Sequence, residues 1–269
     1  MDAIGEQVAL LQREWQTDPR WAGITRDYSA LEVIRLRGRL AAEHGQARGG
    51  AGRLWDLLHN RDGAPVVGSD AVYLANDSSD DAFGLMTEMI DAGAAGVCFG
   101  DLLPAGRAAG HQGEQVLVPT RHHIGTLNAA RLAADVLGVP ALIIARTGAH
   151  AASLLTSAVD PRDHEFLTGE RTADGYHRVE PGWYACVTRQ LEYAPYADLL
   201  WLETPAPDLA LARAFACIIH SQYPDKLLAY SCPAPDGDAS MAEFQAELAA
   251  MGYRFQAAAP AGQRAPAYA

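Results

Sequence analysis

The chain has 269 residues, of which 49% are hydrophobic, so it can bury a large core, and α/β barrels of this length fold as one domain. Its formal net charge is −12, with 21 Lys and Arg against 33 Asp and Glu, which argues against binding nucleic acid because phosphate recognition needs clustered basic residues. No apolar run approaches the roughly 18 residues of a membrane span, and the amino terminus lacks the layout of a signal peptide; no membrane contact is expected, and the cytoplasm is the expected location.

An amino-terminal helical segment is predicted for residues 1–60, ahead of an α/β barrel over residues 61–269, the two forming a single domain. Apolar residues at helical spacing predict a helix over residues 4–15. Asp18-Pro19 follows, and the residue before a proline disfavours helix, so this helix is expected to end there.

A second helix is predicted at residues 30–43, because Ser29 and Glu32 have the spacing of a capping box. The arginines of this helix are expected to face solvent. They are Arg35, Arg37 and Arg39. Residues 45–52 are predicted to be a glycine-rich break, followed by a short helix at residues 53–59.

From residue 61 onward, strands and helices alternate, which predicts a parallel sheet with crossover helices. The predicted strands are residues 65–68, 71–75, 96–99, 141–146, 198–203, 227–231 and 254–258. The predicted helices are residues 83–92, 120–137, 148–156, 182–193, 209–222 and 241–251. Seven strands are one fewer than a closed TIM-type (β/α)8 barrel requires, so either the barrel is incomplete or one strand escapes the pattern.

Two polar segments are candidates for chemistry. Asp70 and the aspartates at 77, 80 and 81 could hold a hard cation through oxygen, or else form a solvated turn that caps the next helix. The second segment follows the strand at residues 96–99 and contains Asp101, Arg107 and His111; active-site loops of barrel enzymes lie in this position. His122-His123 opens the following helix and is expected to face solvent.

Several longer words of the sequence resemble the isocitrate lyase family, within the phosphoenolpyruvate mutase and isocitrate lyase superfamily. They are WQTDPRW (15–21), GITRDYS (23–29), RLAADVLGVPALIIART (131–147), FLTGERT (166–172), YAPYADLLWLETPAPDL (193–209) and FQAELAAMGYRFQ (244–256). The resemblance implies a TIM-type barrel that breaks or forms bonds next to a carboxylate, with magnesium (Mg²⁺) holding a 2-oxo acid or its enolate.

The chain departs from the family at the positions that carry the reaction. The family's Lys-Lys-Cys-Gly-His motif reads Arg-Ala-Ala-Gly-His at residues 107–111, with Ala109 in place of the cysteine, so the family's acid step cannot come from this position. Gly100 and Gly148 stand where the family has a glutamate and an aspartate. The long stretch that carries the family's substrate loop and metal motif is reduced to residues 61–81, where Asp70 is one residue out of place. Asp70 and Asp101 are thus the remaining candidates for metal ligands, and the replacement of most of the family's metal ligands argues against bound Mg²⁺.

The positions that keep the family's residues predict the site. His111, Arg146 and Glu203 are the predicted catalytic residues, with Arg146 as a bidentate carboxylate clamp and His111 as acid-base. The predicted substrate contacts are Arg146 and Thr204, together with two replaced positions, Arg107 where the resemblance places a lysine and Ser231 where it places an asparagine. Alternatively, Arg146 and Glu203 form a structural ion pair.

Two functions fit this pattern. One is a lyase-type enzyme re-purposed for a small carboxylate, which is not a working isocitrate lyase. The other is a catalytically inactive relative with a binding or regulatory role. The resemblance also implies carboxyl-terminal helices that exchange between subunits, which the family places beyond residue 269, so any homo-oligomer is expected to form without that exchange.

Overall fold

The computed structural model describes residues 3–37, 44–60, 65–67, 72–75, 80–104, 114–232 and 238–258. Its centre is a seven-stranded sheet in which all neighbouring strands are parallel. The strands are β1 (Val66–Val67), β2 (Val72–Ala75), β3 (Gly96–Gly100), β5 (Leu142–Arg146), β9 (Leu199–Glu203), β10 (Leu227–Cys232) and β11 (Tyr253–Ala258). All seven correspond to predicted strands.

The strand order is β1-β11-β10-β9-β5-β3-β2, so two strands that are consecutive in the chain, β1 and β2, lie at opposite edges. The sheet therefore curls as part of a barrel, and within the described residues no ladder of hydrogen bonds joins its two edges. The described residues thus form a (β/α)8-like barrel with seven of its strands, which agrees with the predicted fold class and strand count.

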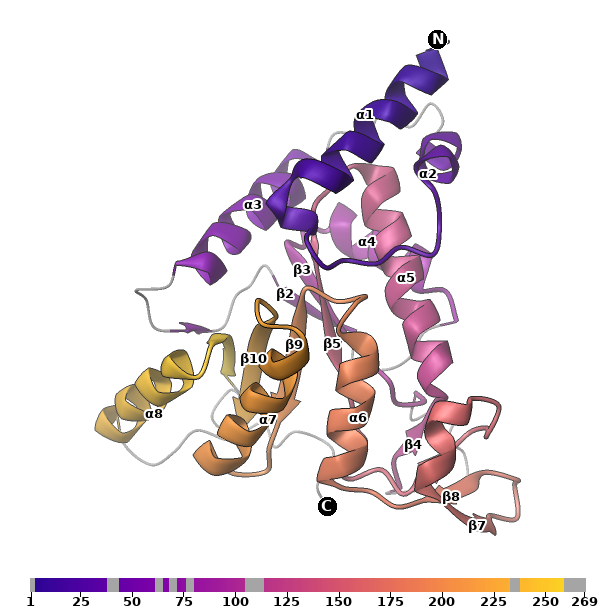
Figure 1. Cartoon of the computed structure of the whole chain (residues 1–269), viewed down its shortest axis with the longest axis vertical. Coiled ribbons are helices and arrows are strands. Elements are labelled where there is room, and N and C mark those ends of the chain that lie inside the picture. The colour runs from indigo at the N-terminus through magenta and orange to yellow at the C-terminus, as the bar shows by residue number, and fades with distance from the viewer. Residues whose placement is uncertain are drawn as a thin grey trace.

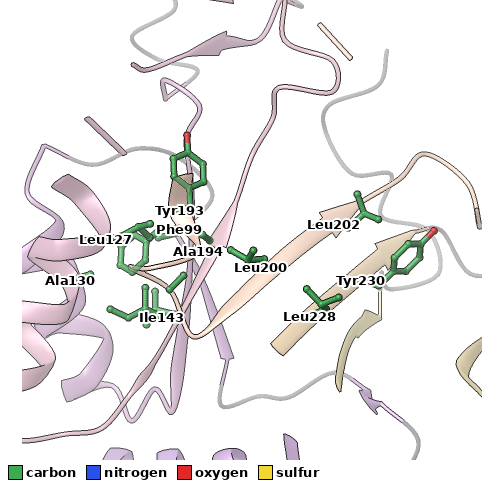
Figure 2. Packing of buried hydrophobic residues seen from close by; sticks show 14 of the residues in the cluster. Phe99, Leu127, Ala130, Ile143, Tyr193, Ala194, Leu200, Leu202, Leu228 and Tyr230 are labelled. Atoms are coloured by element: carbon green, nitrogen blue, oxygen red, sulfur yellow. The ribbon is translucent and has the colours of Figure 1, made fainter. Parts of the chain in front are cut away.

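Five helices accompany the strands (Figure 1): α4 (Ala82–Asp91), α5 (Thr120–Leu137), α6 (Trp183–Tyr193), α7 (Leu209–Gln222) and α8 (Asp238–Ala250). Alternate strand residues face them, and Figure 2 shows Phe99 and Ile143 beside Leu127 of α5, within the largest buried cluster. The intervening residues fill the barrel interior as a separate cluster. Its members include Cys98, Ile144, Trp201, Ala229 and Phe255. None of the helices within the described ranges is long and apolar enough to cross a membrane.

The amino-terminal segment forms α1 (Ala3–Thr17), a 3-10 turn at Pro19–Trp21, α2 (Ala30–Arg37) and α3 (Gly45–His59). The predicted capping box is confirmed: the Ser29 amide donates to Glu32 Oε2 at 2.7 Å, and the Glu32 amide donates to Ser29 Oγ at 3.3 Å. Arg37 corrects the prediction of a solvated face, because its guanidinium donates to the backbone oxygens of Asp135 and Val136 at the end of α5. Residues 38–43, the predicted end of this helix, lie outside the described residues.

The predicted glycine-rich break at residues 45–52 is also wrong, because helix α3 runs through it. Its buried residues recur at helical spacing, as Ala47, Ala51, Leu54 and Leu58. At Gly50, an added Cβ would lie 3.3 Å from the Cβ of Ala95, just before β3. Glycine is thus used here for close packing of a helix against the sheet, and that contact outweighs its poor helix propensity.

Buried ion pairs connect the amino-terminal segment to the barrel at the start of β9. Asp198, which precedes β9, accepts from Arg20 Nη1 and from Arg131 Nη2, each at 2.5 Å, and from the Ile143 amide at 2.7 Å. The Arg20 guanidinium also lies 4.2 Å from the ring centroid of Trp55. Although burial raises the pKa of Asp198, the two arginines outweigh that effect and hold it well below its ordinary value.

The predicted helix at residues 148–156 is wrong. That segment forms a turn and then β6 (Leu154–Leu155), part of a small second sheet with order β4-β6-β8-β7. The other strands are β4 (Val116–Leu117), β7 (Leu167–Arg171) and β8 (His177–Val179), which in Figure 1 lie at the end of the molecule opposite α1. The alanine-rich sequence favours helix locally, but pairing of β6 with β4 and β8 buries both leucines and outweighs that preference.

Candidate functional site

Three of the predicted site residues lie at the carboxyl ends of adjacent strands and on the inner face of the sheet. They are Arg146 of β5, Glu203 of β9 and Ser231 of β10, each two residues after a side chain of the interior cluster. Arg146 Nη1 donates to Glu203 Oε2 at 3.3 Å. Their side chains are 18% and 24% exposed, so this ion pair is reachable from solvent.

The layer below this ion pair forms the floor of the site. Trp201 is 4% exposed, and its Nε1–H donates to Ser231 Oγ at 2.8 Å, so the indole fixes the position of the serine hydroxyl. Cys98 lies in the same interior layer, near enough for Arg146 and Glu203 to affect its titration. Burial raises the pKa of the Cys98 thiol to about 12, so this cysteine stays protonated and is not a nucleophile at neutral pH.

The structure does not bring Asp101 to this inner face. Asp101 follows Gly100 and is fully buried on the outer side of the sheet, where its carboxylate accepts four hydrogen bonds. The donors are Thr147 Oγ1 (2.6 Å), the Gly148 amide (2.9 Å), Arg189 Nη1 (2.9 Å) and the Tyr193 hydroxyl (2.9 Å). Burial raises the pKa of Asp101, but Arg189 and these hydrogen bonds outweigh it and hold the pKa below its ordinary value.

Thr204, a predicted substrate contact, likewise lies on the outer side. Its hydroxyl donates to the Ala206 oxygen at 2.8 Å and lies 2.5 Å from the hydroxyl of Tyr230, which belongs to the helix-facing cluster. Glu203 points inward and its neighbour outward because side chains alternate along a strand. Thr204 therefore supports the end of β9 from behind and does not join Arg146.

The other predicted site residues, Asp70, Arg107 and His111, lie outside the described residues, and their roles stay predictions. Of the aspartates between β2 and α4, Asp81 caps α4 by accepting from the Gly84 amide at 2.8 Å, which supports the predicted helix cap. Asp77 also falls outside the described residues.

The residues present do not fit a magnesium cage within the described part of the chain. On the inner face, Glu203 is paired with Arg146, and position 100 is glycine. No group of three or more His, Cys, Asp or Glu side chains in the described ranges is arranged to hold a metal ion. Because Mg²⁺ needs several oxygen ligands, these residues alone would not hold it.

Gly148, where the resemblance places an aspartate, is sterically closed. A Cβ at this position would lie 2.5 Å from Leu102 Cδ2 and 2.8 Å from Leu102 Cγ. Leu102 packs against the cluster that includes Leu117 and Ala149, between the barrel and the small sheet. An apolar side chain therefore occupies the space that a longer residue at position 148 would need.

Sequence reasoning missed the buried polar residues behind the site. Arg189 and Tyr193, one turn apart on α6, face Asp101, and His123 of α5 packs edge-on against Tyr193 with ring centroids 4.6 Å apart. His123 is fully buried, which corrects the prediction that it faces solvent; its neighbour His122 is exposed. The sequence does contain a signal for this burial. The helical period places Arg189, Tyr193 and His123 on the core-facing sides of their helices.

Comparison with known proteins identifies a family for this chain. The profile described as "Isocitrate lyase family" matches residues 79–172 and 168–269. The chain is 40% identical to isocitrate lyase of Salmonella typhimurium over 344 aligned positions, which cover 93% of this chain and 79% of that protein. It is 36% identical to isocitrate lyase 1 of Mycobacterium tuberculosis, covering 100% of this chain and 83% of that protein. Since the chain has only 269 residues, these relatives contain segments within the matched span that it lacks.

Two solved structures are also similar. A putative phosphonomutase from Burkholderia cenocepacia has a TM-score of 0.45 and 22% identity, covering 79% of this chain and 70% of that chain. A 2,3-dimethylmalate lyase described as a PEP mutase/isocitrate lyase superfamily member has a TM-score of 0.45 and 17% identity, covering 76% and 59%.

Proposed function

Since the chain belongs to the isocitrate lyase family, we propose that it is a lyase-type enzyme re-purposed for a small carboxylate and that it does not cleave isocitrate. The observation that carries this proposal is the partly exposed Arg146 at the open end of the barrel, 3.3 Å from Glu203. A guanidinium recognises a carboxylate through two parallel hydrogen bonds. A ligand carboxylate can therefore replace or share the contact that Glu203 makes.

The neighbouring groups suit the same ligand. Ser231 Oγ accepts the Trp201 N–H, so its own hydroxyl proton is directed elsewhere and can be donated to a ligand oxygen. Glu203, in register with Ser231 on the neighbouring strand, carries a negative charge that competes with a ligand carboxylate for Arg146, so only an acid that bonds to Arg146 better than Glu203 does is expected to bind. Arg107 as a second cation and His111 as the proton carrier complete the proposed site.

Isocitrate cleavage is excluded from the proposal on chemical grounds. Alanine at position 109 has no proton to give, and glycine at positions 100 and 148 removes two carboxylates that the family resemblance places there. Loss of a single group that stabilises charge in a transition state typically costs about two to three orders of magnitude in rate. We derive no step through a metal ion, because the described residues do not form a cage for one.

A thermal-shift panel tests the proposal, because a ligand that binds only the native state raises the melting temperature. Glyoxylate, succinate and isocitrate are added separately, with and without Mg²⁺, and release of glyoxylate from isocitrate is followed in parallel. We expect stabilisation by at least one small carboxylate and no glyoxylate release. Turnover of isocitrate would refute the proposal.

The alternative is a catalytically inactive relative that binds a metabolite or partner. It is favoured by the contact between Gly148 and Leu102, which closes one position of the family's site with apolar packing. This alternative predicts that any carboxylate found to bind is recovered unchanged after prolonged incubation, whereas the enzyme proposal predicts a new product detectable by mass spectrometry.

A further inference from the structure

The polar network behind β5 is connected directly to the residue that the proposed function depends on. Thr147 and Gly148 follow Arg146, and both donate to the carboxylate of Asp101, at 2.6 and 2.9 Å. Thr147 Oγ1 also accepts from the Ala149 amide at 3.1 Å, so the turn that ends β5 is tied at three successive residues. The side chains of Arg146 and Thr147 thus point to opposite sides of the sheet, one toward solvent and one into this network.

Asp101 is itself held by Arg189. Arg189 Nη1 donates to Asp101 Oδ2 at 2.9 Å, while Nη2 donates to Asp163 Oδ1 at 2.8 Å and to the Val118 oxygen at 3.0 Å. The side chains of Arg189, Asp101 and Asp163 are 3%, 0% and 2% exposed. One buried guanidinium therefore bridges two buried carboxylates and fixes its own position through both.

The network also reaches other segments around the open end of the barrel. Asp163 accepts from the Thr120 amide at 2.9 Å and from its hydroxyl at 2.6 Å, at the start of α5. Asp101 lies at the end of β3, whose last residue, Gly100, is in register with Arg146. The ends of β3 and β5 and the start of α5 are consequently set relative to one another by a single connected group of side chains.

From this geometry we infer that Asp101, Thr147 and Arg189 are positioning residues that orient Arg146 for carboxylate binding, acting from the outer side of the barrel wall. The inference rests on the proposed carboxylate site. A bidentate clamp needs its guanidinium fixed in distance and angle, and small displacements are costly. Asp101 is ionised at neutral pH, and its charge strengthens each hydrogen bond that it accepts.

Thr147→Val is the most direct variant, because it keeps the shape of the side chain and replaces only the hydroxyl, by a methyl group. We expect it to weaken succinate binding by about tenfold in isothermal titration calorimetry, in line with the sensitivity of binding sites to their supporting shell. Thr147→Ser retains the hydroxyl and should restore the affinity to within about twofold of wild type. Substitution of Arg189 is not used, since it would strand two buried carboxylates and unfold the protein.

Thr126→Val is the matched control. Thr126 is also a buried threonine, 4% exposed, but its hydroxyl donates within α5, to the His122 oxygen at 3.3 Å, and not to Asp101. It should leave succinate affinity unchanged, even if it lowers the melting temperature as much as Thr147→Val does. Equal affinities for Thr147→Val and wild type, or an equal loss in Thr126→Val, would overturn the inference.

A second readout separates this inference from the proposed function. The Nε–H resonance of Arg146 in a nitrogen-15 correlation spectrum reports its orientation without any ligand. We expect Thr147→Val to shift or broaden that resonance and Thr126→Val to leave it in place. If wild type binds none of the acids tested, the proposed function fails; if the Arg146 resonance is unchanged in Thr147→Val, the positioning role fails.

Discussion

His123 is expected to make the protein labile to mild acid. The residue is fully buried, with 0% exposed. Among the described residues, neither ring nitrogen has a hydrogen-bond partner. Burial lowers the pKa of His123 to about 4 from an ordinary value of 6.5; Asp101 opposes that effect, and Arg189 adds to it. The imidazole is therefore neutral in the folded protein at pH 5 to 7.

The sign of the effect follows from proton uptake. Between pH 6.5 and about 4, the unfolded chain binds a proton at this histidine and the folded chain does not, so the free energy of unfolding falls as the pH falls. The full difference between the two pKa values corresponds to about 3 kcal/mol. Between pH 7.5 and pH 5, His123 should account for a loss of about 2 kcal/mol.

His123→Phe removes this titration and keeps an aromatic ring against Tyr193. We expect urea unfolding at pH 7.5 and at pH 5 to show about 2 kcal/mol less acid destabilisation in the variant than in wild type. His122→Gln, at the exposed neighbouring position, should behave as wild type in the same comparison. Parallel pH dependences for wild type and His123→Phe would refute the reasoning.

Three other substitutions test the packing. Asp198→Asn should cost about 3 to 5 kcal/mol in urea unfolding, because it leaves two buried arginines without their shared carboxylate; a loss below 1 kcal/mol would contradict this. Gly52→Ala, in open space within α3, should raise stability by about 0.5 to 1 kcal/mol, and a lower melting temperature would count against the helix. Gly148→Ala should lower the free energy of unfolding by about 1 to 3 kcal/mol, because the new methyl group clashes with Leu102. Combined with Leu102→Ala, it should destabilise by less than the sum of the two single variants, whereas additive losses would argue against the contact.

The sheet could be predicted from the sequence because each buried parallel strand is a short apolar run between polar turns. The segment at residues 148–156 could not, since its local preference for helix is overridden by pairing with strands distant in the chain. The first half of α3, residues 45–52, was missed for a related reason: Gly50 is favoured there by a close contact with Ala95 that the sequence does not reveal.

The candidate site was predicted in part. Arg146 and Glu203 lie together on the inner face, but Asp101 and Thr204 each directly follow an inward position and so point the other way. Because side chains alternate strictly along a strand, the outward direction of Asp101 and Thr204 follows once Arg146 and Glu203 are assigned to the inner face. The role of Arg189 could not be predicted, because it depends on two carboxylates that lie 88 and 26 residues away in the chain.

Arg146 is proposed to anchor a small carboxylate at the open end of the barrel, and a pair of arginine variants tests this role most directly. Arg213 provides the control, since it forms an exposed ion pair at 3.1 Å with Glu247, between α7 and α8. In calorimetric titrations with succinate and glyoxylate, we expect Arg146→Met to abolish binding and Arg213→Met to retain the wild-type affinity. Equal affinities for Arg146→Met and Arg213→Met would contradict the account.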